Sequence, residues 1–573
     1  MKDPIRMKSS PTHLYAAGQL SRRGFMKSLA ALGISAATAS YLADTSQAIA
    51  QTQAYNTKNL KASYDYIICG AGSAGCVLAA ELSERNPEAS ILLLEAGGAD
   101  DAAGILDLLW IKIYQDPSLF WLFQGLPNPL LNNRIPPLPM GRVIGGGSSV
   151  NALIYARGHK ADYDGWAQQL GDDRWSYQNV VKTFLAMEDY EGPASPLRGV
   201  GGKFHSSVQT DIAPLARDMR SAGGSFGLPV VEDINAETME RDGGIAYSNI
   251  IEKDGKRGSV ARAFLHPVLA SPNITVLTNA TVLGLAMEGT RATGVSLRWR
   301  DETRVISASS RVILSSGALK TPQILMLSGI GPAAHISKFG ISPKVDLPGV
   351  GENFHDHPLV ASCAWEAPYD FDPMANGSQC VYFANVNSPA GAPDLMPVQM
   401  QIPFVSPENA SSAKMPERNL WVIVPGLAKP RSRGSVYLKS DNIMDDPAVD
   451  TRFLSVQHDF DTLLLGIEQA REIGNSAAMR DHVLREVLPG PKSRDDLKEF
   501  VRNGCSTYYH MCGTARMGTD TDEMAVTLSD LSVRGVENLS IADTSIFPDV
   551  PRSNTMVPAA MVGYKLADIL TGR

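Results

Sequence analysis

A glycine-rich turn followed by a carboxylate gives this sequence the features of a nucleotide-binding site. An apolar run leads into Gly70-x-Gly72-x-x-Gly75, and a helical pattern follows it. Gly70 permits a tight turn, Gly72 lets a pyrophosphate approach the backbone, and Gly75 lets the helix pack on the strand. A second apolar run ends in Glu95, whose carboxylate is placed to bind a ribose diol and would repel a 2′-phosphate. The pattern predicts a dinucleotide other than NADP, with FAD and NAD both open.

A second glycine-rich segment, residues 141–164, carries polar groups that suit a ligand. Its three consecutive glycines, Gly145–Gly147, allow a ligand to approach the backbone closely. Ser148, Ser149 and Asn151 place hydroxyl and amide groups beside this bare backbone, as recognition of a flat, polar heterocycle requires. Gly/Ser runs are usually flexible loops, so the segment alone leaves that interpretation open. Its place downstream of the nucleotide fingerprint favours a binding role.

Taken together, the motifs resemble those of the glucose–methanol–choline (GMC) family of FAD-dependent oxidoreductases. The segments that carry the resemblance are Gly141–Asp164, Gly317–Gly331, Leu347–Pro358, Thr507–Thr514 and Pro551–Pro558. The resemblance extends from about residue 64 to the C-terminus, and it implies FAD where the fingerprint alone left NAD open. It also implies an α/β fold, in which an FAD-binding Rossmann-like domain is interleaved with an α+β substrate domain built on an antiparallel sheet.

The expected domain organisation follows the motifs and the local patterns. Residues 1–50 are expected to be a signal peptide, 64–356 the main FAD-binding part, 357–520 the substrate-binding domain, and 521–573 a return to the FAD domain. Short β-patterned runs over residues 274–315 predict an antiparallel meander. Further β-like runs are 397–405, 419–426 and 434–439, and helices are predicted over 176–187, with Ser176 as N-cap, from about 458, and over 557–570.

Two residues near the C-terminus are the catalytic candidates that the resemblance implies. In the family, the histidine of a Tyr-His-x-x-Gly-Thr-like motif faces the flavin, and a His or Asn from a later motif lies beside it. These positions are His510 and Asn554 here. A neutral histidine can take the hydroxyl proton of an alcohol. Asn cannot act as a base, but its amide can orient the alcohol so that a hydride passes to flavin N5; the alternative for Asn554 is helix capping.

The resemblance also implies a set of residues that contact FAD. They are Gly70, Gly72, Ser73, Ala74, Gly75, Glu95, Ala96, Arg142, Gly146, Ser148, Asn151, Ala152, Leu153, Val282, Ala542, Asp543 and Thr555. In relatives that attach FAD covalently through a histidine, that histidine falls near Ser149 or Val150, and neither residue can form the link. We therefore expect non-covalent FAD. The residue after the catalytic histidine is often Pro in the family and is Met511 here, which is expected to reshape the pocket wall.

Other potential ligand residues are interpreted as structural. His355 and His357 form a pair at i, i+2, but no third metal ligand is evident and the family uses no metal, so no metal site is predicted. The six cysteines contain no Cys-x-x-Cys pair, which argues against zinc. Cys363 and Cys380 leave a disulfide open, and Cys505 and Cys512, which flank His510, are interpreted as pocket-lining.

The N-terminus has the pattern of an export signal. Ser21–Lys27 reads as a twin-arginine motif, an Ala-rich stretch follows, and Ala48–Ala50 is an A-x-A cleavage site. This pathway carries folded proteins, so the mature enzyme is expected in the periplasm with FAD already bound. No other segment approaches 18 apolar residues, so no stable membrane span is expected. The chain is acidic, with a net charge of −8, which argues against a nucleic-acid partner.

These observations favour an FAD-dependent alcohol dehydrogenase that oxidises a small primary alcohol or a polyol to the carbonyl. Its electrons would pass to a quinone, a cytochrome or O₂ rather than to NAD. Three alternatives stay open: an alcohol oxidase that releases H₂O₂, a lyase of the same fold without redox turnover, and a non-catalytic flavin-binding partner. The intact His510 and Asn554 pair disfavours the last of these.

Overall fold

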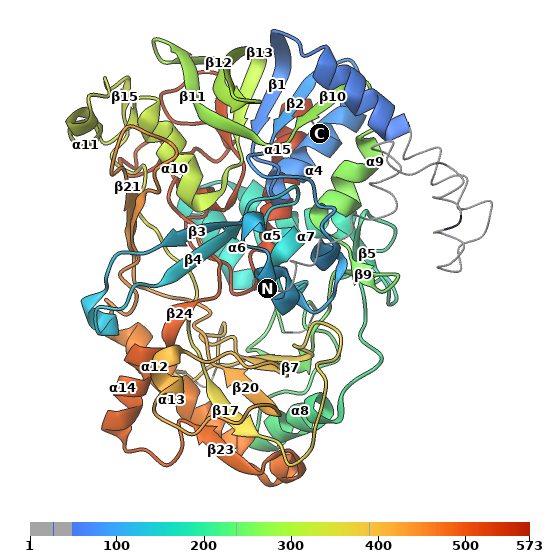
Figure 1. Ribbon diagram of the computed structural model, residues 1–573, viewed down its shortest axis with the longest axis vertical. Coiled ribbons are helices and arrows are strands. Elements are labelled where there is room, and N and C mark those ends of the chain that lie inside the picture. The colour runs from blue at the N-terminus through green and yellow to red at the C-terminus, as the bar shows by residue number, and fades with distance from the viewer. Residues whose placement is uncertain (1–26, 28–47, 237, 389, 573) are drawn as a thin grey trace, which may run out of the picture.

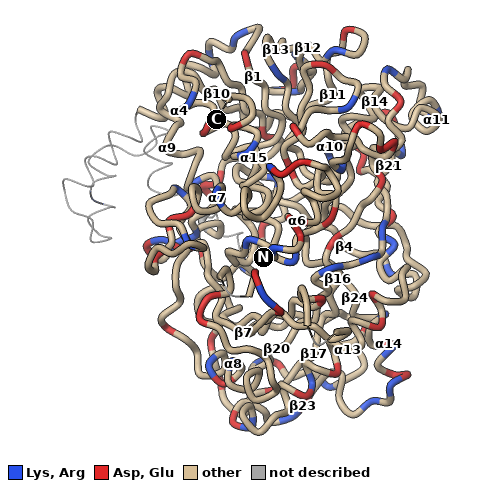
Figure 2. The backbone as a smooth tube through the Cα atoms, turned by 180° about the vertical axis from the view of Figure 1, so that it is seen from behind, with Lys and Arg blue, Asp and Glu red and all other residues tan. Residues whose placement is uncertain are grey.

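The computed structural model describes residues 27, 48–236, 238–388 and 390–572. These residues form two lobes, each built around a β-sheet, which occupy the upper and lower parts of Figure 1. The predicted twin-arginine motif and its Ala-rich stretch lie outside the described residues, apart from Lys27 and the A-x-A site. Figure 2 shows acidic and basic residues in both lobes. In the described part of the chain, no helix is both long enough and apolar enough to cross a bilayer.

The first lobe contains a seven-stranded mixed sheet. Its path is β10 (Ile274–Leu277), β2 (Ile91–Leu94), β1 (Ser63–Cys69), β13 (Glu302–Leu314), β12 (Arg291–Trp299) and β11 (Ala280–Glu288), and β25 (Leu539–Ile541) also pairs with β13. The pairings among β10, β2, β1, β13 and β25 are parallel, whereas β11, β12 and the start of β13 form an antiparallel meander. Strands β2 and β25 and the parallel-paired residues 66–69 of β1 and 312–314 of β13 are mainly apolar and almost completely buried, as expected for strands covered on both faces.

Two helices from opposite ends of the sequence pack together in the first lobe. Helix α4 (Ser73–Arg85) follows the predicted nucleotide turn, and α15 (Met556–Thr571) closes the chain beside it (Figure 1). A Cβ at Gly563 would lie 2.2 Å from the carbonyl oxygen of Ala74, so only glycine permits this close approach. The packing therefore holds the C-terminal motif next to the start of α4.

The second lobe contains a six-stranded antiparallel sheet. Its order is β23 (Arg485–Leu488), β17 (Cys363–Glu366), β20 (Leu420–Val424), β19 (Val398–Met400), β18 (Cys380–Phe383) and β7 (Gly244–Tyr247). Helices α8 (Pro214–Phe226), α13 (Gln457–Gly474) and α14 (Arg494–Gly504) belong to this lobe (Figure 1). The rings of Trp365 and Trp421 stack 4.5 Å apart in its core. Because β7 precedes residue 357, the chain enters this lobe earlier than the expected domain boundary.

A short antiparallel ladder connects the two lobes. Strand β16 (Pro358–Val360) pairs with β24 (Cys505–Thr507), and a further bridge joins His355 to Cys512. The hairpin of β3 (Phe120–Gln124) and β4 (Pro137–Gly141) also lies between the lobes (Figure 1). The ladder places the segment that contains His357 directly beside the segment that contains His510.

Most predicted elements are present, with small differences. The predicted helix over 176–187 is α7 (Tyr177–Met187), but the hydroxyl of Ser176 donates to the carbonyl of Asp173 and does not cap the helix. The run 434–439 contains β21 (Ser435–Tyr437), which pairs with β22 (Ala448–Asp450) outside the second sheet. The shorter elements are α5 (Gly147–Val150), α6 (Lys160–Leu170), α9 (His266–Val268), α10 (Gly317–Leu327), α11 (Ala333–Ile336), α12 (Pro407–Ala410), β5 (Glu188–Tyr190), β6 (Phe204–Ser206), β8 (Glu252–Lys253), β9 (Lys256–Arg257), β14 (Ile330–Gly331) and β15 (Val345–Asp346).

All six cysteines are free and buried. Burial raises the pKa of the Cys69 and Cys505 thiols to about 12, so these two side chains are neutral thiols at physiological pH. The disulfide left open for Cys363 and Cys380 is not formed in this structure, and Cys505 and Cys512 do not line the cavity described below.

Candidate active site

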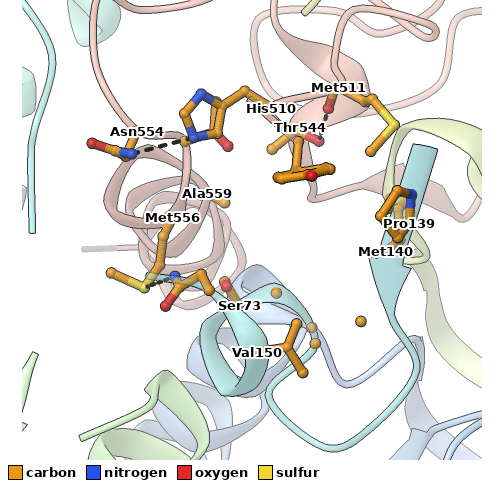
Figure 3. Close-up of a pocket in the computed structure, with 18 of the residues that line it drawn as sticks. Ser73, Pro139, Met140, Val150, His510, Met511, Thr544, Asn554, Met556 and Ala559 are labelled. Carbon is orange, nitrogen blue, oxygen red and sulfur yellow. Dashed lines mark hydrogen bonds between the residues drawn. The ribbon is translucent and has the colours of Figure 1, made fainter. Parts of the chain in front are cut away.

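A large cavity extends from the nucleotide turn to the second sheet. It contains about 2230 Å³ of empty space, including its opening to solvent. Its walls come from the turn at 70–74, the Gly/Ser segment at 146–152, strands β18 and β19, and two C-terminal segments at 508–511 and 554–556. Figure 3 shows part of this cavity, with His510 and Asn554 on one side and Ser73 and Val150 on another. The sequence motifs therefore converge on one space.

The glycines of the nucleotide turn are required by close backbone packing. A Cβ at Gly70 would lie 2.3 Å from the carbonyl oxygen of Ser315, and one at Gly75 would lie 2.0 Å from that of Gly70. At Gly72 the situation differs, because the nearest atom to an added Cβ is 3.9 Å away and the residue lines the cavity. The bare backbone at Gly72 therefore leaves room for a ligand rather than for another part of the protein.

The start of α4 and the carboxylate of Glu95 together suit a nucleotide. No side chain caps the N-terminus of α4, so its first N–H groups are free to bind an anion at this end of the cavity. The Glu95 carboxylate accepts hydrogen bonds from the backbone N–H groups of Ala71 (3.0 Å) and Gly97 (2.8 Å). Burial raises the pKa of Glu95 to about 7, against the effect of these N–H donors. Each oxygen keeps a lone pair for a ribose hydroxyl.

The serines of the Gly/Ser segment stabilise the loop itself. The Ser148 hydroxyl donates to the Gly145 carbonyl (2.7 Å), and the Ser149 hydroxyl donates to the Ile144 carbonyl (2.7 Å). Asn151 does line the cavity. Its side-chain oxygen accepts from the backbone N–H of Leu153 (3.0 Å) and from the buried guanidinium of Arg257 (2.9 Å). Because the oxygen accepts both of these hydrogen bonds, the orientation of the Asn151 amide is fixed, and its NH₂ group is the end that can donate.

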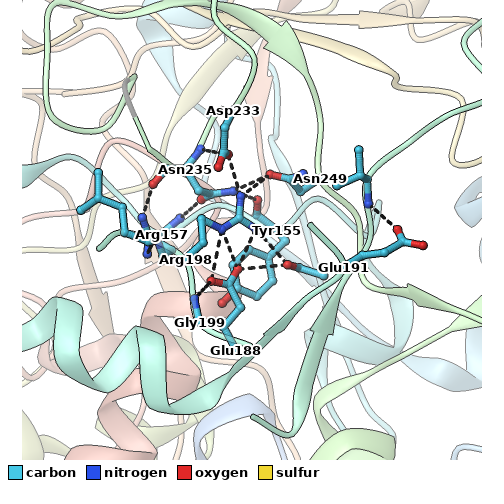
Figure 4. Close-up of polar contacts among 12 residues, drawn as sticks. Tyr155, Arg157, Glu188, Glu191, Arg198, Gly199, Asp233, Asn235 and Asn249 are labelled. Atoms are coloured by element: carbon cyan, nitrogen blue, oxygen red, sulfur yellow. Dashed lines mark hydrogen bonds and ion pairs between the residues drawn. The ribbon is translucent and has the colours of Figure 1, made fainter. Parts of the chain in front are cut away.

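A buried polar network anchors the end of the Gly/Ser segment (Figure 4). The Arg198 guanidinium forms an ion pair with Glu188 (2.7 Å), and both side chains are almost completely buried. It also binds Asp233 (2.6 Å) and the side-chain oxygen of Asn249 (3.1 Å). Asn235 connects this cluster to the Gly/Ser segment, because its amide donates to the Tyr155 carbonyl (2.9 Å). The network therefore holds the end of the Gly/Ser segment at Tyr155, and its members Arg198, Glu188 and Tyr155 do not themselves line the cavity.

Most of the predicted FAD-contacting residues reach the cavity. Those that line it are Gly70, Gly72, Ser73, Ala74, Glu95, Ala96, Gly146, Asn151, Ala152, Val282, Asp543 and Thr555, together with His510 and Asn554. Those that do not are Gly75, Arg142, Ser148, Leu153 and Ala542. The Arg142 guanidinium lies 4.7 Å from the centre of the Trp121 ring. The Ala542 carbonyl accepts from the Ser315 hydroxyl (2.8 Å), so this residue supports the wall from behind.

His510 and Asn554 face each other across one end of the cavity (Figure 3). The Asn554 amide nitrogen lies 3.4 Å from Nε2 of His510. His510 follows β24, and Asn554 lies just before α15, so elements from both lobes position the pair. Burial alone lowers the pKa of the His510 imidazole to about 3, so the ring is neutral at physiological pH. A neutral ring beside an amide can accept a proton from a hydroxyl that binds both groups.

His357 contacts His510 on the side away from Asn554. The two Nδ1 atoms lie 2.8 Å apart, and the ring planes are perpendicular. The buried carboxyl of Asp356 accepts from the backbone N–H groups of His510 (3.0 Å) and His357 (2.7 Å). Its other oxygen accepts from the Thr507 hydroxyl, and burial raises the pKa of Asp356 to about 7. The expectation that His357 is structural therefore misses its contact with a candidate catalytic residue.

His355 has a different environment from His357. Its Nδ1 is 2.6 Å from the Asn353 carbonyl. Its ring packs against Gly513 so closely that a Cβ added to this glycine would lie only 2.4 Å from a carbon of the ring. Within the described residues, no group of three or more His, Cys, Asp or Glu side chains is arranged to hold a metal ion.

Sequence reasoning did not find several residues of the cavity wall. Tyr508 stacks parallel to His510 with ring centres 5.6 Å apart, and its hydroxyl donates to a backbone carbonyl, with Met396 and Val424 both 3.0 Å away. Met511, predicted to reshape the wall, does line the cavity, and its carbonyl accepts from the Thr544 hydroxyl (2.9 Å; Figure 3). Tyr508 lies two positions before His510 in the sequence, and this spacing could have identified it as a residue of the cavity wall. The residues on β18 and β19 belong to no motif.

Comparison with known proteins gives the family. The N-terminal model of the GMC oxidoreductases matches residues 64–359, and the C-terminal model matches residues 430–563. The chain is a GMC oxidoreductase. It is 35% identical to the alcohol dehydrogenase [acceptor] of Pseudomonas putida over 88% of this chain and 95% of that protein. It is 33% identical to human mitochondrial choline dehydrogenase over 89% of this chain and 90% of that protein.

A solved structure agrees with this family. The crystal structure of pyridoxine 4-oxidase from Mesorbium loti superposes with a TM-score of 0.83 and 30% identity, and it covers 88% of this chain and 98% of that chain. The predicted α/β fold and the resemblance to the GMC family are confirmed. The protein is an FAD-dependent oxidoreductase that acts on CH–OH donors.

The residues of the cavity fit FAD. The space beside Gly72, the uncapped start of α4 and the remaining acceptor positions of Glu95 match a dinucleotide at one end. The same cavity continues to Asn151 and to the pair of His510 and Asn554 at the other end. Where the family resemblance puts an attachment histidine, the Ser149 hydroxyl is held by a backbone carbonyl and Val150 is apolar.

Proposed function

We propose that this GMC oxidoreductase is an alcohol dehydrogenase that oxidises a primary alcohol to the carbonyl and passes its electrons to an acceptor other than NAD. The observation that carries the proposal is the position of a neutral His510 imidazole beside the Asn554 amide at the cavity end opposite the nucleotide turn. When bound, FAD supplies the acceptor for the hydride that leaves the alcohol carbon.

His510 acts as the base through Nε2. Its ring is neutral and therefore carries one hydrogen, and the Nδ1 contact with His357 needs one donor. If Nδ1–H of His510 donates to Nδ1 of His357, Nε2 is left as an acceptor that faces Asn554. The alcohol proton then moves to Nε2, and His357 stabilises the resulting imidazolium by accepting its Nδ1–H.

Asn554 positions the alcohol oxygen. In the tautomer described above, an Asn554 N–H points at Nε2 of His510 across 3.4 Å, a distance at which a hydrogen bond is weak. An alcohol placed between the two would donate its hydroxyl proton to Nε2 and accept from the amide. The carbon that bears the alcohol is thereby held in one orientation while the proton leaves.

The acceptor and the covalent state of FAD are further parts of the proposal. The names of the relatives include both a dehydrogenase with an unspecified acceptor and, at 30% identity, an oxidase. We favour a quinone or a cytochrome over O₂, and we propose non-covalent FAD. We also propose export through the twin-arginine pathway to the periplasm, which rests on the sequence of residues 1–50 alone.

An anaerobic spectral experiment tests this function. Primary alcohols added to the FAD-loaded enzyme without O₂ should bleach the visible flavin absorbance. Slow recolouring on re-aeration supports a dehydrogenase, whereas fast recolouring with rapid release of H₂O₂ identifies an oxidase. If no alcohol bleaches the flavin and carbon–carbon cleavage is observed, the enzyme is a lyase and the proposal is wrong.

A further inference from the structure

The wall of the cavity that belongs to the second sheet is apolar. Strand β18 contributes Val381 and Phe383, and β19 contributes Val398 and Met400. Val381 pairs directly with Val398, and the neighbouring pair is Cys380 with Gln399. Because side chains alternate along a strand, Gln399 is on the opposite face of the sheet from these four residues and does not line the cavity, whereas Tyr382, between Val381 and Phe383, does line it. The four side chains Val381, Phe383, Val398 and Met400 therefore give this wall an apolar surface.

No acidic side chain from the second sheet lines the cavity in the part of the chain that the structure describes. The acidic residues that do line it, Glu95 and Asp543, belong to the first lobe. Backbone N–H groups hold Glu95, and Asp543 accepts from the Thr321 hydroxyl (2.6 Å) and the Gly317 N–H (2.9 Å). His510 is neutral. A substrate with a permanent positive charge would find no carboxylate on this wall to compensate its desolvation.

The side chains of Val381, Phe383, Val398 and Met400 also offer no hydrogen bond to a substrate with many hydroxyls. The Tyr508 hydroxyl is directed at the backbone carbonyls of Met396 and Val424. The polar pair of His510 and Asn554 serves the reacting hydroxyl only. Each further hydroxyl of a polyol would lose its hydrogen bonds to water without replacement, so it would weaken binding.

We propose that the physiological substrate is an uncharged primary alcohol with an apolar chain or ring, selected by the β18–β19 wall. This inference rests on the proposed alcohol oxidation and narrows its substrate class. It excludes choline-like quaternary ammonium alcohols and polyols, although several curated relatives are named as choline dehydrogenases. The sequence motifs do not separate these classes, because they lie in the parts of the site that bind the cofactor and the reacting hydroxyl.

A pair of isosteric alcohols tests the charge argument. Choline and 3,3-dimethylbutan-1-ol have nearly the same shape and differ in the charge of one central atom. Anaerobic stopped-flow reduction of the holoenzyme should give a kcat/KM at least about 100-fold higher for the uncharged alcohol. An equal or higher value for choline would overturn the inference. Hexan-1-ol should exceed hexane-1,6-diol, and each added methylene from ethanol to hexanol should raise kcat/KM by roughly tenfold, until the chain fills the pocket.

A matched pair of variants tests the wall itself. Met400→Glu adds a carboxylate to the wall, and Met400→Gln adds a polar group of similar size without charge. The Glu variant should raise the ratio of choline to 3,3-dimethylbutan-1-ol activity, mainly through KM, whereas the Gln variant should lower activity on the uncharged alcohol without improving choline. FAD content and melting temperature show whether each variant is folded; if Met400→Glu does not fold, Val398→Asp with Val398→Asn replaces it.

The outcomes separate this inference from the function on which it rests. If no alcohol of any class reduces the flavin, alcohol oxidation itself is wrong. If alcohols reduce the flavin but choline or the diol is preferred, the function stands and the substrate class is wrong. An unchanged ratio in the folded Glu variant would show that this wall does not contact the substrate.

Discussion

The Nδ1 atom of His357 lies 2.8 Å from the Nδ1 atom of His510, although 153 positions separate the two residues in the sequence. Burial lowers the pKa of His357 well below its ordinary value, and the nearby His510 and His355 lower it further. His357 is therefore neutral and can accept a hydrogen bond from His510. If Nδ1–H of His510 donates in this contact, Nε2 of His510 carries no hydrogen and faces Asn554 as an acceptor.

Replacing His357 should slow flavin reduction without releasing FAD. His357→Phe removes the acceptor for His510 Nδ1–H, so we expect flavin reduction by alcohol to slow by about tenfold or more. His357→Asn keeps an acceptor near the same position and should recover much of the rate. Stopped-flow reduction measures both, and the flavin spectrum reports FAD retention. A His357→Phe enzyme that retains FAD and the wild-type rate would show that this contact does not matter.

Replacing the two residues that face each other should have unequal effects. His510→Ala removes the base and should slow flavin reduction by roughly 10²–10⁴-fold while FAD remains bound. Asn554→Ala should slow it less, because it removes one hydrogen bond and leaves the base. Anaerobic single-turnover kinetics measures both variants. If the His510→Ala enzyme holds FAD and reduces it at the wild-type rate, the base is elsewhere.

The pH dependence of reduction should lack the titration of an ordinary histidine. A protonated His510 cannot accept the alcohol proton, so activity falls as pH falls through the pKa of His510. With that pKa lowered to about 3, the rate constant for flavin reduction should not fall through this group between pH 8 and pH 5. An ordinary pKa of about 6.5 would reduce the neutral fraction about 30-fold at pH 5. A step near pH 7 that disappears in Asp356→Asn belongs to Asp356, whose pKa is raised to about 7.

The same pKa shift affects stability. The unfolded chain binds the His510 proton at its ordinary pKa, whereas the folded chain binds it at about 3. The unfolded state therefore takes up the proton first, and His510 weakens the fold as pH falls from about 6.5 toward 3. The melting temperature of His510→Gln should fall less than that of the wild type over this range. If the melting temperatures of the two proteins fall equally with pH, the lowered pKa of His510 is contradicted.

The sequence predicts the cofactor end of the site better than the substrate end. Gly70, Gly75 and Glu95 follow from local geometry, because a tight turn and a strand end need those residue types at fixed spacing. The approach of His510 to Asn554 followed from family motifs. By contrast, the contact of His357 with His510 depends on the β16–β24 ladder, and the apolar wall depends on the pairing of β18 with β19. Such long-range pairings leave no local pattern.

A side chain at Gly72 should prevent FAD binding without unfolding the protein. The added side chain of Gly72→Val has space in the protein but occupies the cavity that the pyrophosphate needs. Gly165 is a matched control, because an added Cβ there meets nothing within 4 Å and the residue does not line the cavity. Purified Gly165→Val should be yellow and Gly72→Val colourless, with both giving a cooperative melting transition. Loading of FAD by Gly72→Val would show that the pyrophosphate binds elsewhere.

FAD should leave the denatured enzyme. Neither Ser149 nor Val150, at the position of the family's attachment histidine, can form the covalent link. Acid precipitation of the yellow enzyme should therefore release FAD into the supernatant, measured by its absorbance and fluorescence. Flavin that stays in the pellet would contradict non-covalent binding.

Export should depend on the arginine pair. Cleavage of the signal peptide should leave the hydrogen bonds of Gln53 intact. Arg22→Lys with Arg23→Lys should retain the precursor in the cytoplasm, and the exported wild type should begin near Gln51 by mass spectrometry. That start keeps Gln53, whose amide donates to the Leu269 carbonyl (2.8 Å) and accepts from the Val276 N–H (3.1 Å) at the edge strand β10. A chain that begins at residue 57 loses these bonds and should melt at a lower temperature than one that begins at Gln51. Unchanged periplasmic yield of the double Lys variant would rule out the twin-arginine route, and equal melting temperatures would show that the Gln53 contacts add no stability.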